Sequence, residues 1–286
     1  MQVLKTKKEV RIAIEKAKTS NRKVGFVATM GYLHKGHLSL IQKSIEDKCF
    51  TVVSIFVNPL QFGPAEDFQR YPRDIERDIS ILKETNVDVV FVPSVEEMYS
   101  EKHLTTISVA DISEKLEGAI RPGHFTGVCT VVAKLFNIIQ PHNAYFGWKD
   151  AQQLIIIRKM VKDIDFNISV IGVETFREPD GLAASSRNVY LSEEQRKRAL
   201  VLSRALQEIK QMVEYQGIVE YQGIKETEVL ISRGIRIIET EDVELQYLEA
   251  VDLENLERVE SIKKNTGILG AIKVGNVRLI DNIIWE

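Results

Sequence analysis

The stretch VGFVATMGYLHKGH, residues 24–37, joins a purely apolar run to a segment with two glycines and two histidines. The apolar run shows no polar alternation, which predicts a strand buried on both faces, as in parallel sheets covered by helices. We expect a helix near residues 36–48, so the glycines and histidines fall between a strand end and a helix start. Ligands of doubly wound α/β sheets bind at that place, and a helix N-terminus suits phosphate.

The same alternation of apolar runs and helical patterns continues along the first half of the chain. Strands are expected at 50–57, 88–93, 144–147 and 166–173, and helices near 74–84, 127–139 and 151–161. Strands that alternate with helices predict a doubly wound α/β domain with a parallel sheet.

The second half of the chain has a different character. A polar segment with Pro and Gly, residues 177–188, precedes a long amphipathic pattern that begins at Ser192, with Gln195 completing a capping box, and the domain boundary is expected within 174–190. A second helix is expected at 225–240, followed by three strands at 243–252, 266–275 and 277–285, the last two joined by a Gly-Asn turn. These elements predict a smaller α+β domain. A tandem VEYQGI hexapeptide at 213–224 receives no function.

Composition restricts the class of protein. The chain has 286 residues, 44% hydrophobic residues and a formal net charge of −3, so charge favours neither nucleic acid nor an anionic membrane as a partner. No apolar run approaches 18 residues, and the N-terminus lacks the apolar core of a secretory signal. We therefore expect a cytoplasmic protein. Cys49 and Cys129, each within an apolar segment, are expected to be buried small side chains.

The histidine pair has two interpretations. His34 and His37 are three residues apart, so on the first turn of a helix both rings lie on one face and can bind the same polyphosphate. Protonated histidine stabilises the charge that grows as a phosphoryl bond breaks. In the alternative, one ring caps a carbonyl and the other is solvent-exposed. Zinc is disfavoured because no third Cys or His is near.

Polar side chains also follow two other predicted strands. Asn58 and Gln61 come after the strand at 50–57 and suit the hydroxyls and carboxylate of a substrate, although Asn58 can equally build an Asn-Pro turn. Lys149 follows the strand at 144–147 as a point charge for phosphate. Asp150 is as readily a helix cap, and Gln153 lies one helical turn further on.

Three further groups have both a functional and a structural interpretation. Residues 185–187, Ser-Ser-Arg in a Gly-containing loop, can close over a triphosphate or form a surface loop. Asp74 and Asp78 are possible magnesium ligands, or the solvated face of a helix. Arg121 and His124 flank a Pro-Gly turn that is either an active-site loop or purely structural.

Five blocks in order carry a resemblance to a known family. They are TMGYLHKGH, SIFVNPLQFGPAEDFQRYPR, LEGAIRPGHFTGV, AYFGWKDAQQL and REPDGLAASSRNVYLS, and they run from about residue 25 to 192. Together with the ending RLIDNI, they resemble the pantoate–β-alanine ligases, also called pantothenate synthetases. One block alone is weak evidence, whereas five in order are specific.

The resemblance implies a fold and a reaction. Residues 1–176 would form a Rossmann-like domain that binds ATP and pantoate, and residues 177–286 a smaller α+β lid domain. The HKGH segment would correspond to the HIGH motif of class I aminoacyl-tRNA synthetases, and the loop at 185–187 to their KMSKS signature. Pantoate would attack ATP to give pantoyl adenylate and pyrophosphate, and β-alanine would then displace AMP to give pantothenate. Magnesium would accompany ATP, and the protein would be a homodimer.

The resemblance also implies roles for particular residues. His37 would be the proton donor, and the catalytic set would be His37, His34, Lys149 and Arg187. The ATP-binding set would be Met30, Gly31, Tyr32, Leu33, His34, Lys35, Gly36, His37, Gly147, Trp148, Lys149, Asp150, Phe176, Ala184, Ser185, Ser186 and Arg187. Pantoate and β-alanine would meet Gln61, Gln153, Asn58 and Met30, and Asp78 would be linked to magnesium.

Two departures and two alternatives accompany this expectation. Ala28 stands where the family usually has proline, and Phe176 where a smaller aliphatic residue is common. A nucleotidyltransferase acting on a phosphorylated acceptor would share the histidine signature, but the neutral Gln61 and Gln153 do not suit a phosphate-bearing substrate. A nucleotide sensor or an RNA-binding module is the second alternative, and the net acidity argues against RNA.

Overall fold

The computed structural model describes residues 1–64, 66–99, 102–216 and 226–286. The chain divides into two compact units, one of residues 1–147 and 152–174, the other of residues 148–151 and 175–286. The predicted division after residue 176 differs mainly in leaving the short segment 148–151 with the first domain. The second copy of the tandem hexapeptide, 219–224, lies outside the described residues.

The first unit is built on a six-stranded sheet with the strand order β1-β4-β3-β2-β5-β6. Every neighbouring pair is parallel, which confirms the predicted doubly wound sheet. Because β2 pairs with both β3 and β5, the strand order reverses beside β2, and ligands of such sheets bind at the carboxyl ends of the strands there. The strands are β1 Gln2–Leu4, β2 Val24–Thr29, β3 Phe50–Ile55, β4 Val89–Phe91, β5 Asn143–Gly147 and β6 Ser169–Val173.

Strand β1 was not expected from the sequence. It has three residues, two of them exposed, and pairs only with β4 at the edge of the sheet. Helix α1 follows it, with Thr6 as N-cap and Glu9 completing a capping box. A short edge strand that faces water on one side has no apolar run to reveal it.

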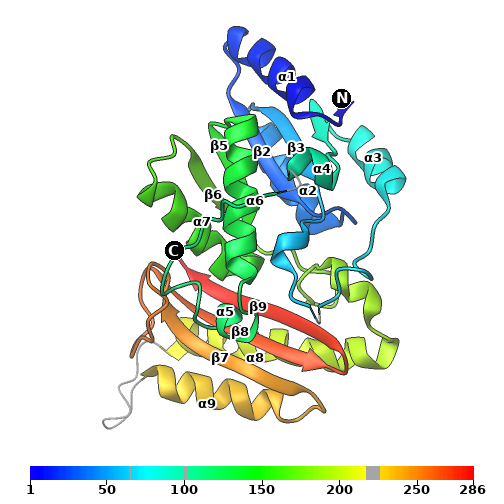
Figure 1. Cartoon of the computed structure of the whole chain (residues 1–286). Helices are drawn as coiled ribbons and strands as arrows, with labels where there is room; N and C mark the ends of the chain where they lie inside the picture. Colours follow the sequence, from blue (N-terminus) through cyan, green and yellow to red (C-terminus); the bar gives the residue numbers. More distant parts are fainter. Residues whose placement is uncertain (65, 100–101, 217–225) are drawn as a thin grey trace. The chain divides into compact units, whose positions relative to one another are not determined.

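Helices cover both faces of this sheet (Figure 1). Val27 and Tyr145 are buried in a cluster that includes Leu40 of α2. Phe26, which alternates with Val27 on β2, points the other way and meets Phe136 of α6 at 6.3 Å between ring centroids. The helices of this unit are α1 Lys7–Thr19, α2 Lys35–Glu46, α3 Ile75–Lys83, α4 Val95–Met98, α5 Glu117–Ile120, α6 His124–Ile139 and, apart from its first residue, α7 Ala151–Asp163, with a 3-10 turn at Pro59–Gln61.

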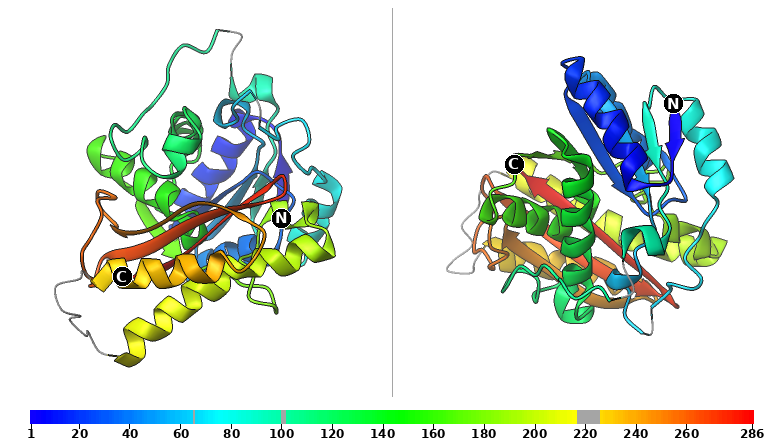
Figure 2. Two further views of the ribbon diagram at one scale, coloured as in Figure 1. Left: turned by 90° about the horizontal axis from the view of Figure 1, so that it is seen from below. Right: turned by 45° about the horizontal axis from the view of Figure 1, so that its top comes forward.

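The second unit is a three-stranded antiparallel sheet with two long helices (Figure 2). Its elements are the 3-10 turns Trp148–Asp150 and Ser186–Tyr190, α8 Glu193–Gln216, α9 Glu226–Ile238, β7 Glu244–Asp252, β8 Thr266–Val274 and β9 Val277–Trp285. The capping box before α8 is confirmed, since Ser192 Oγ accepts the Gln195 N–H at 3.2 Å and Gln195 Oε1 accepts the Ser192 N–H at 3.0 Å. The hairpin is confirmed by Gly275, with φ +56°, between β8 and β9.

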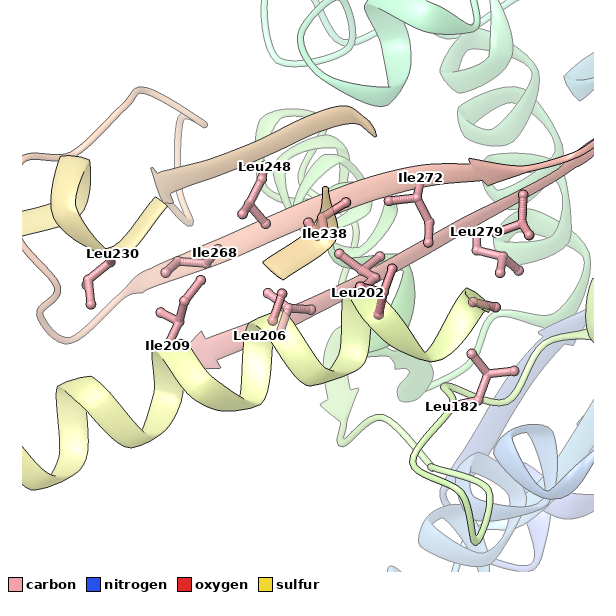
Figure 3. Close-up of a cluster of buried hydrophobic side chains, with 14 of the residues drawn as sticks. Leu182, Leu202, Leu206, Ile209, Leu230, Ile238, Leu248, Ile268, Ile272 and Leu279 are labelled. Atoms are coloured by element: carbon pink, nitrogen blue, oxygen red, sulfur yellow. The ribbon is translucent and has the colours of Figure 1, made fainter. Parts of the chain in front are cut away.

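A continuous apolar face of α8 holds this second unit together. Leu202, Leu206 and Ile209 follow helical spacing and point from α8 toward the strands (Figure 3). They meet Ile268 and Ile272 of β8, and all five side chains are buried. Each such burial contributes about 1.5–3 kcal/mol.

The two cysteines are part of the protein interior. Cys49 and Cys129 are both free thiols and both buried, as predicted. Burial raises the pKa of Cys129 to about 12, so this thiol stays protonated and unreactive. Among the described residues, no helix has the length and apolarity needed to cross a membrane.

Candidate active site

The connection from β2 to α2 is a tight loop at the carboxyl end of the sheet's central region. Gly31 has φ +82° and Tyr32 has φ +50°, so two successive residues adopt the left-handed conformation. The chain then enters α2 with His34 as its N-cap. The loop therefore presents both histidines at the ligand-binding edge of the sheet.

Backbone N–H groups determine which ring nitrogen carries the proton in each of the two histidines. His34 Nδ1 accepts the Gly36 N–H at 3.1 Å, and His37 Nδ1 accepts the His34 N–H at 3.3 Å. A nitrogen that accepts a backbone N–H carries no proton, so each neutral ring is protonated at Nε2. The ring centroids are 4.0 Å apart. The pair predicted from its spacing thus forms two neighbouring Nε2–H donors, and neither ring caps a carbonyl through Nδ1.

Asp78 of α3 fixes the loop that precedes the histidines. Its Oδ2 accepts the Tyr32 N–H and its Oδ1 accepts the Leu33 N–H, both at 2.7 Å. The side chain is fully buried, and a Cβ at Gly31 would lie 3.0 Å from Oδ2. Arg77 adds a bond from Nη2 to the Leu33 carbonyl at 3.1 Å. Burial raises the pKa of Asp78, against the opposing effect of the two N–H groups.

The same contacts bear on the expected magnesium role of Asp78. Both carboxylate oxygens already bind backbone N–H groups, and Asp74 accepts the Arg77 N–H at 3.0 Å as the N-cap of α3. Within the part of the chain that the structure describes, no group of three His, Cys, Asp or Glu could hold a metal ion. The observed role of Asp78 is to hold the loop, and its metal role stays a prediction.

The hydrogen-bond partners of Asn58 show which atom of its side-chain amide is the oxygen and which is the nitrogen. Its Oδ1 accepts the Leu60 N–H at 3.3 Å and the Tyr99 hydroxyl at 2.8 Å. Because a backbone N–H only donates, the atom facing Leu60 is the oxygen. Nδ2 therefore donates, to the Gly127 carbonyl and to Gln61 Oε1, each at 3.1 Å. Asn58 is 1% exposed, so its amide binds only groups inside the protein. It joins Gln61 to Gly127 and also builds the Asn-Pro turn.

Asn58 in turn orients the side chain of Gln61. Since Gln61 Oε1 accepts from Asn58, the amide nitrogen Nε2 points to the other side, where it lies 3.1 Å from the Met30 sulfur. Met30 and Gln61, both predicted to line the substrate site, are thus neighbours. Gln153 is half-buried on α7. The adjacent Gln152 is buried and donates to carbonyls of the 112–115 segment, which is a structural task.

Gly127 allows α6 to lie against the turn that carries Gln61. A Cβ there would be 2.1 Å from the Leu60 carbonyl oxygen and 2.6 Å from Gln61 Cα, both backbone atoms that cannot rotate away. We expect Gly127→Ala to lower the free energy of unfolding by about 1–3 kcal/mol through overpacking, as measured by urea titration. Gly63→Ala is the control, because a Cβ there makes only ordinary contacts, the nearest at 3.7 Å. Equal stability of the two variants would contradict the account.

In the second unit, residues 176–188 form an ordered loop. Ala184 N–H binds the Phe176 carbonyl at 3.0 Å, and Ser185 Oγ accepts the Arg187 N–H at 3.3 Å where the 3-10 turn begins. Asn188 Nδ2 donates to Glu178 Oε1 at 2.8 Å. Ser186 is buried, whereas Ser185 and Arg187 are half-buried.

Lys149 is held by β9 of the same unit. Asn282 Nδ2 donates to the Trp148 carbonyl at 2.7 Å and to the Lys149 carbonyl at 3.0 Å. The Lys149 ammonium lies 3.2 Å from Asp150 Oδ1. Asn282 is 6% exposed, so this anchor is an internal one.

Several residues of this framework were not singled out from the sequence. Tyr99, Gly127 and Asn282 hold predicted site residues but are 41, 69 and 133 positions away from the residues they bind. The spacing of neighbouring residues in the sequence cannot predict contacts over such distances along the chain. The signals in the sequence were the position of Gly127, now seen in α6, and of Asn282, each within a block of otherwise recognisable residues.

The fold and the histidine loop together define a class of protein. A doubly wound parallel sheet with two Nε2–H donors at a helix start beside β2 is typical of nucleotide-binding α/β enzymes that act on phosphate groups.

Comparison with known proteins specifies the class. The family model for pantoate-beta-alanine ligase matches residues 2–284. The chain is 49% identical to the pantothenate synthetase of Acetivibrio thermocellus, over 100% of both chains, and 51% identical to that of Sulfurihydrogenibium sp., over 99% of both. A crystal structure of pantothenate synthetase from Thermus thermophilus matches with TM-score 0.92 and 44% identity over 99% of both chains. The Francisella tularensis pantoate-beta-alanine ligase, complexed with beta-gamma ATP and beta-alanine, matches with TM-score 0.78 and 35% identity, over 99% of this chain and 97% of that one.

The chain therefore belongs to the pantoate–β-alanine ligase family. It is a ligase that condenses pantoate with β-alanine at the expense of ATP, and the resemblance seen in the five sequence blocks is confirmed. The nucleotidyltransferase and RNA-binding alternatives are set aside.

Proposed function

We propose that residues 30–37 hold the ATP phosphates and that His34 and His37 stabilise the adenylation transition state through their Nε2–H groups. The observation that supports this proposal is the protonation pattern: both Nδ1 atoms accept backbone N–H groups, so both donors are Nε2. Donors fixed before the reaction cost no reorganisation when negative charge develops on the phosphoryl group.

We assign pantoate to Gln61 and Gln153, with Met30 beside Gln61 and with Asn58 as the internal residue that orients Gln61. Gln61 Nε2 is directed away from Asn58, so it can donate to a carboxylate or hydroxyl of pantoate. A neutral amide positions the pantoate carboxylate without the strong charge pairing of an arginine, which would weaken it as a nucleophile. Gln61 is also assigned to β-alanine.

The proposed reaction has two steps. A pantoate carboxylate oxygen attacks the α-phosphorus of ATP, a P–O bond to pantoate forms, and the P–O bond to the leaving pyrophosphate breaks. The β-alanine amine then attacks the carbonyl carbon of pantoyl adenylate, an amide bond forms, AMP leaves and the amine loses a proton. No covalent bond to the enzyme is required, so an activated Ser or Cys is unnecessary. Holding carboxylate and triphosphate together overcomes their mutual repulsion.

Residues of the second unit are assigned to the nucleotide. Lys149 and Arg187 would supply positive charge to the phosphates, with Ser185 and Ser186 as hydroxyl partners. Trp148, Asp150, Phe176 and Ala184 of this unit, together with Gly147 at the end of β5 in the first unit, would contact the remainder of ATP. If the backbone at 176 meets adenine, a phenylalanine in place of a smaller residue is tolerated.

Three further expectations stay predictions: a homodimer, a cytoplasmic location, and closure of the second unit as a lid. Magnesium is expected to arrive with ATP, bound mainly by its phosphate oxygens. No step of the mechanism above depends on it.

The assignment of Gln61 is tested by Gln61→Ala in steady-state kinetics. Loss of one amide hydrogen bond to a charged ligand costs about 1.5–3 kcal/mol, so we expect the KM for pantoate to rise roughly 10–100-fold with the KM for ATP little changed. Gln42→Ala is the matched control, because Gln42 is exposed on α2 and bonds only to Glu46 among the contacts described. An unchanged KM for pantoate in Gln61→Ala would remove this residue from the substrate site.

A further inference from the structure

The Pro-Gly turn before α6 carries a hydrogen-bond chain that the assignments above leave unused. Glu66 accepts Arg121 with both oxygens, Nε to Oε1 at 2.6 Å and Nη2 to Oε2 at 2.7 Å. Arg121 Nη1 lies 3.0 Å from His124 Nε2, and His124 Nδ1 lies 2.8 Å from the Gln61 carbonyl oxygen. We call these three side chains the Glu66–Arg121–His124 chain.

The chemistry of the partners assigns the protons of His124. A guanidinium can only donate, so Nε2 accepts from Arg121 and carries no proton. A carbonyl oxygen can only accept, so Nδ1 carries the proton and donates to Gln61. The ring is therefore the neutral Nδ1–H tautomer, opposite to that of His34 and His37. Burial and the Arg121 charge lower the pKa of His124 to about 4, which agrees with a neutral ring at pH 7.

The ion pair at the far end holds the arginine in place. The exposed fractions of the Arg121 and Glu66 side chains are 15% and 24%, and the two-pronged geometry is the strongest form of this pair. Glu66 Oε2 also accepts the Gly63 N–H at 3.2 Å. The chain thus joins the segment just after Gln61 to the start of α6 and returns to the backbone of Gln61 itself.

Gln61 is consequently held at two points. Asn58 fixes its side-chain oxygen, and His124 fixes its backbone carbonyl. Two anchors on one residue determine the direction of Nε2 more closely than either anchor alone. This is the second layer of contacts that a substrate-binding amide needs to keep its geometry.

We propose that His124, kept as the neutral Nδ1–H tautomer by the Glu66–Arg121 ion pair, is a positioning residue that sets Gln61 for pantoate binding. The proposal rests on the assignment of Gln61 to pantoate made above. It resolves the two interpretations that the sequence left open for Arg121 and His124: the turn is structural, and its structure serves the substrate amide.

The test compares His124→Asn with His124→Gln in the full-length enzyme. The amide nitrogen of Asn occupies the place of Nδ1 and can still donate to the Gln61 carbonyl, whereas the amide of Gln reaches the place of Nε2. We expect His124→Gln to raise the KM for pantoate roughly 5–10-fold, the value of one hydrogen bond, and His124→Asn to stay within about twofold of wild type. The KM for ATP should be unchanged in both. Equal effects of the two variants, or none in His124→Gln, would overturn the proposal.

Two further measurements separate the possible failures. Gln61→Ala is assayed in parallel: if it leaves the KM for pantoate unchanged, the proposed function of Gln61 fails, whereas a raised KM there with no effect in His124→Gln defeats only the positioning role. The ¹⁵N chemical shifts of His124 in the unmutated protein do not depend on whether any variant folds. We expect a protonated Nδ1 and a bare Nε2 at pH 7, and a protonated Nε2 would contradict the assignment.

Discussion

Replacement of His37 by alanine should lower the rate of pantoyl adenylate formation by a factor on the order of 10²–10³, the usual cost of removing one fixed donor from a developing oxyanion. His37 also accepts the His34 N–H through Nδ1, so alanine removes a helix-start contact together with the donor. His37→Asn separates the two functions, because its side-chain oxygen can replace Nδ1 as acceptor while no donor remains at the place of Nε2. We expect His37→Asn to be nearly as slow as His37→Ala but more stable.

The measurement is single-turnover formation of the adenylate with ATP and pantoate in the absence of β-alanine. His142→Ala is the matched control. The Nδ1 atom of His142 accepts the Val24 N–H at 2.9 Å, at the opposite, amino end of β2, and we expect it to change the adenylation rate less than threefold. A normal adenylation rate in His37→Asn would mean that Nε2 does not serve the chemistry.

Replacement of Asp78 by alanine should lower the free energy of unfolding by about 2–6 kcal/mol, since it leaves the N–H groups of Tyr32 and Leu33 without their acceptor in a buried site, at about 1–3 kcal/mol each. Both bonds are 2.7 Å long and the carboxylate is fully buried. We expect adenylation to slow as well, because the loop that leads to His34 loses its anchor. Asp78→Asn should be almost as damaging, because an amide offers only one acceptor to two donors.

Urea titration measures this effect, and Asp74→Ala is its control on the same helix. Asp74 is exposed and caps α3 by accepting the Arg77 N–H, so its loss should cost about 1 kcal/mol. If Asp78→Ala were no less stable than Asp74→Ala, the loop would not depend on the buried carboxylate. Restoration of adenylation in Asp78→Ala by raised magnesium would instead favour the predicted metal role of Asp78.

The features that the sequence predicts well are those with local causes. The apolar run at 24–28 marks a strand buried on both faces, and Ser192 with Gln195 marks a helix start, because in each case the responsible residues are neighbours in the chain. The position of the histidine pair also has a local cause, since residues three apart lie together at the start of one helix.

The features that the sequence does not predict depend on contacts between distant segments. β1 is a strand because it pairs with the edge of β4. From the sequence alone, Asp78 is expected on the solvated face of a helix, whereas in the fold α3 lies beside the loop at Tyr32 and the carboxylate is buried against it. The acceptor and donor roles in His124 likewise depend on Arg121 and Gln61 together. Such assignments need the hydrogen-bond partners, which the order of residues alone does not contain.

The measurement that tests the central claim most directly is a mass-spectrometric assay of the purified protein with ATP, magnesium and D-pantoate, with and without β-alanine. We expect pantoyl adenylate and pyrophosphate when β-alanine is absent, and AMP and pantothenate when all three substrates are present. Consumption of ATP without pantoyl adenylate or pantothenate would contradict the proposed two-step reaction and the assignment of pantoate as the attacking acid.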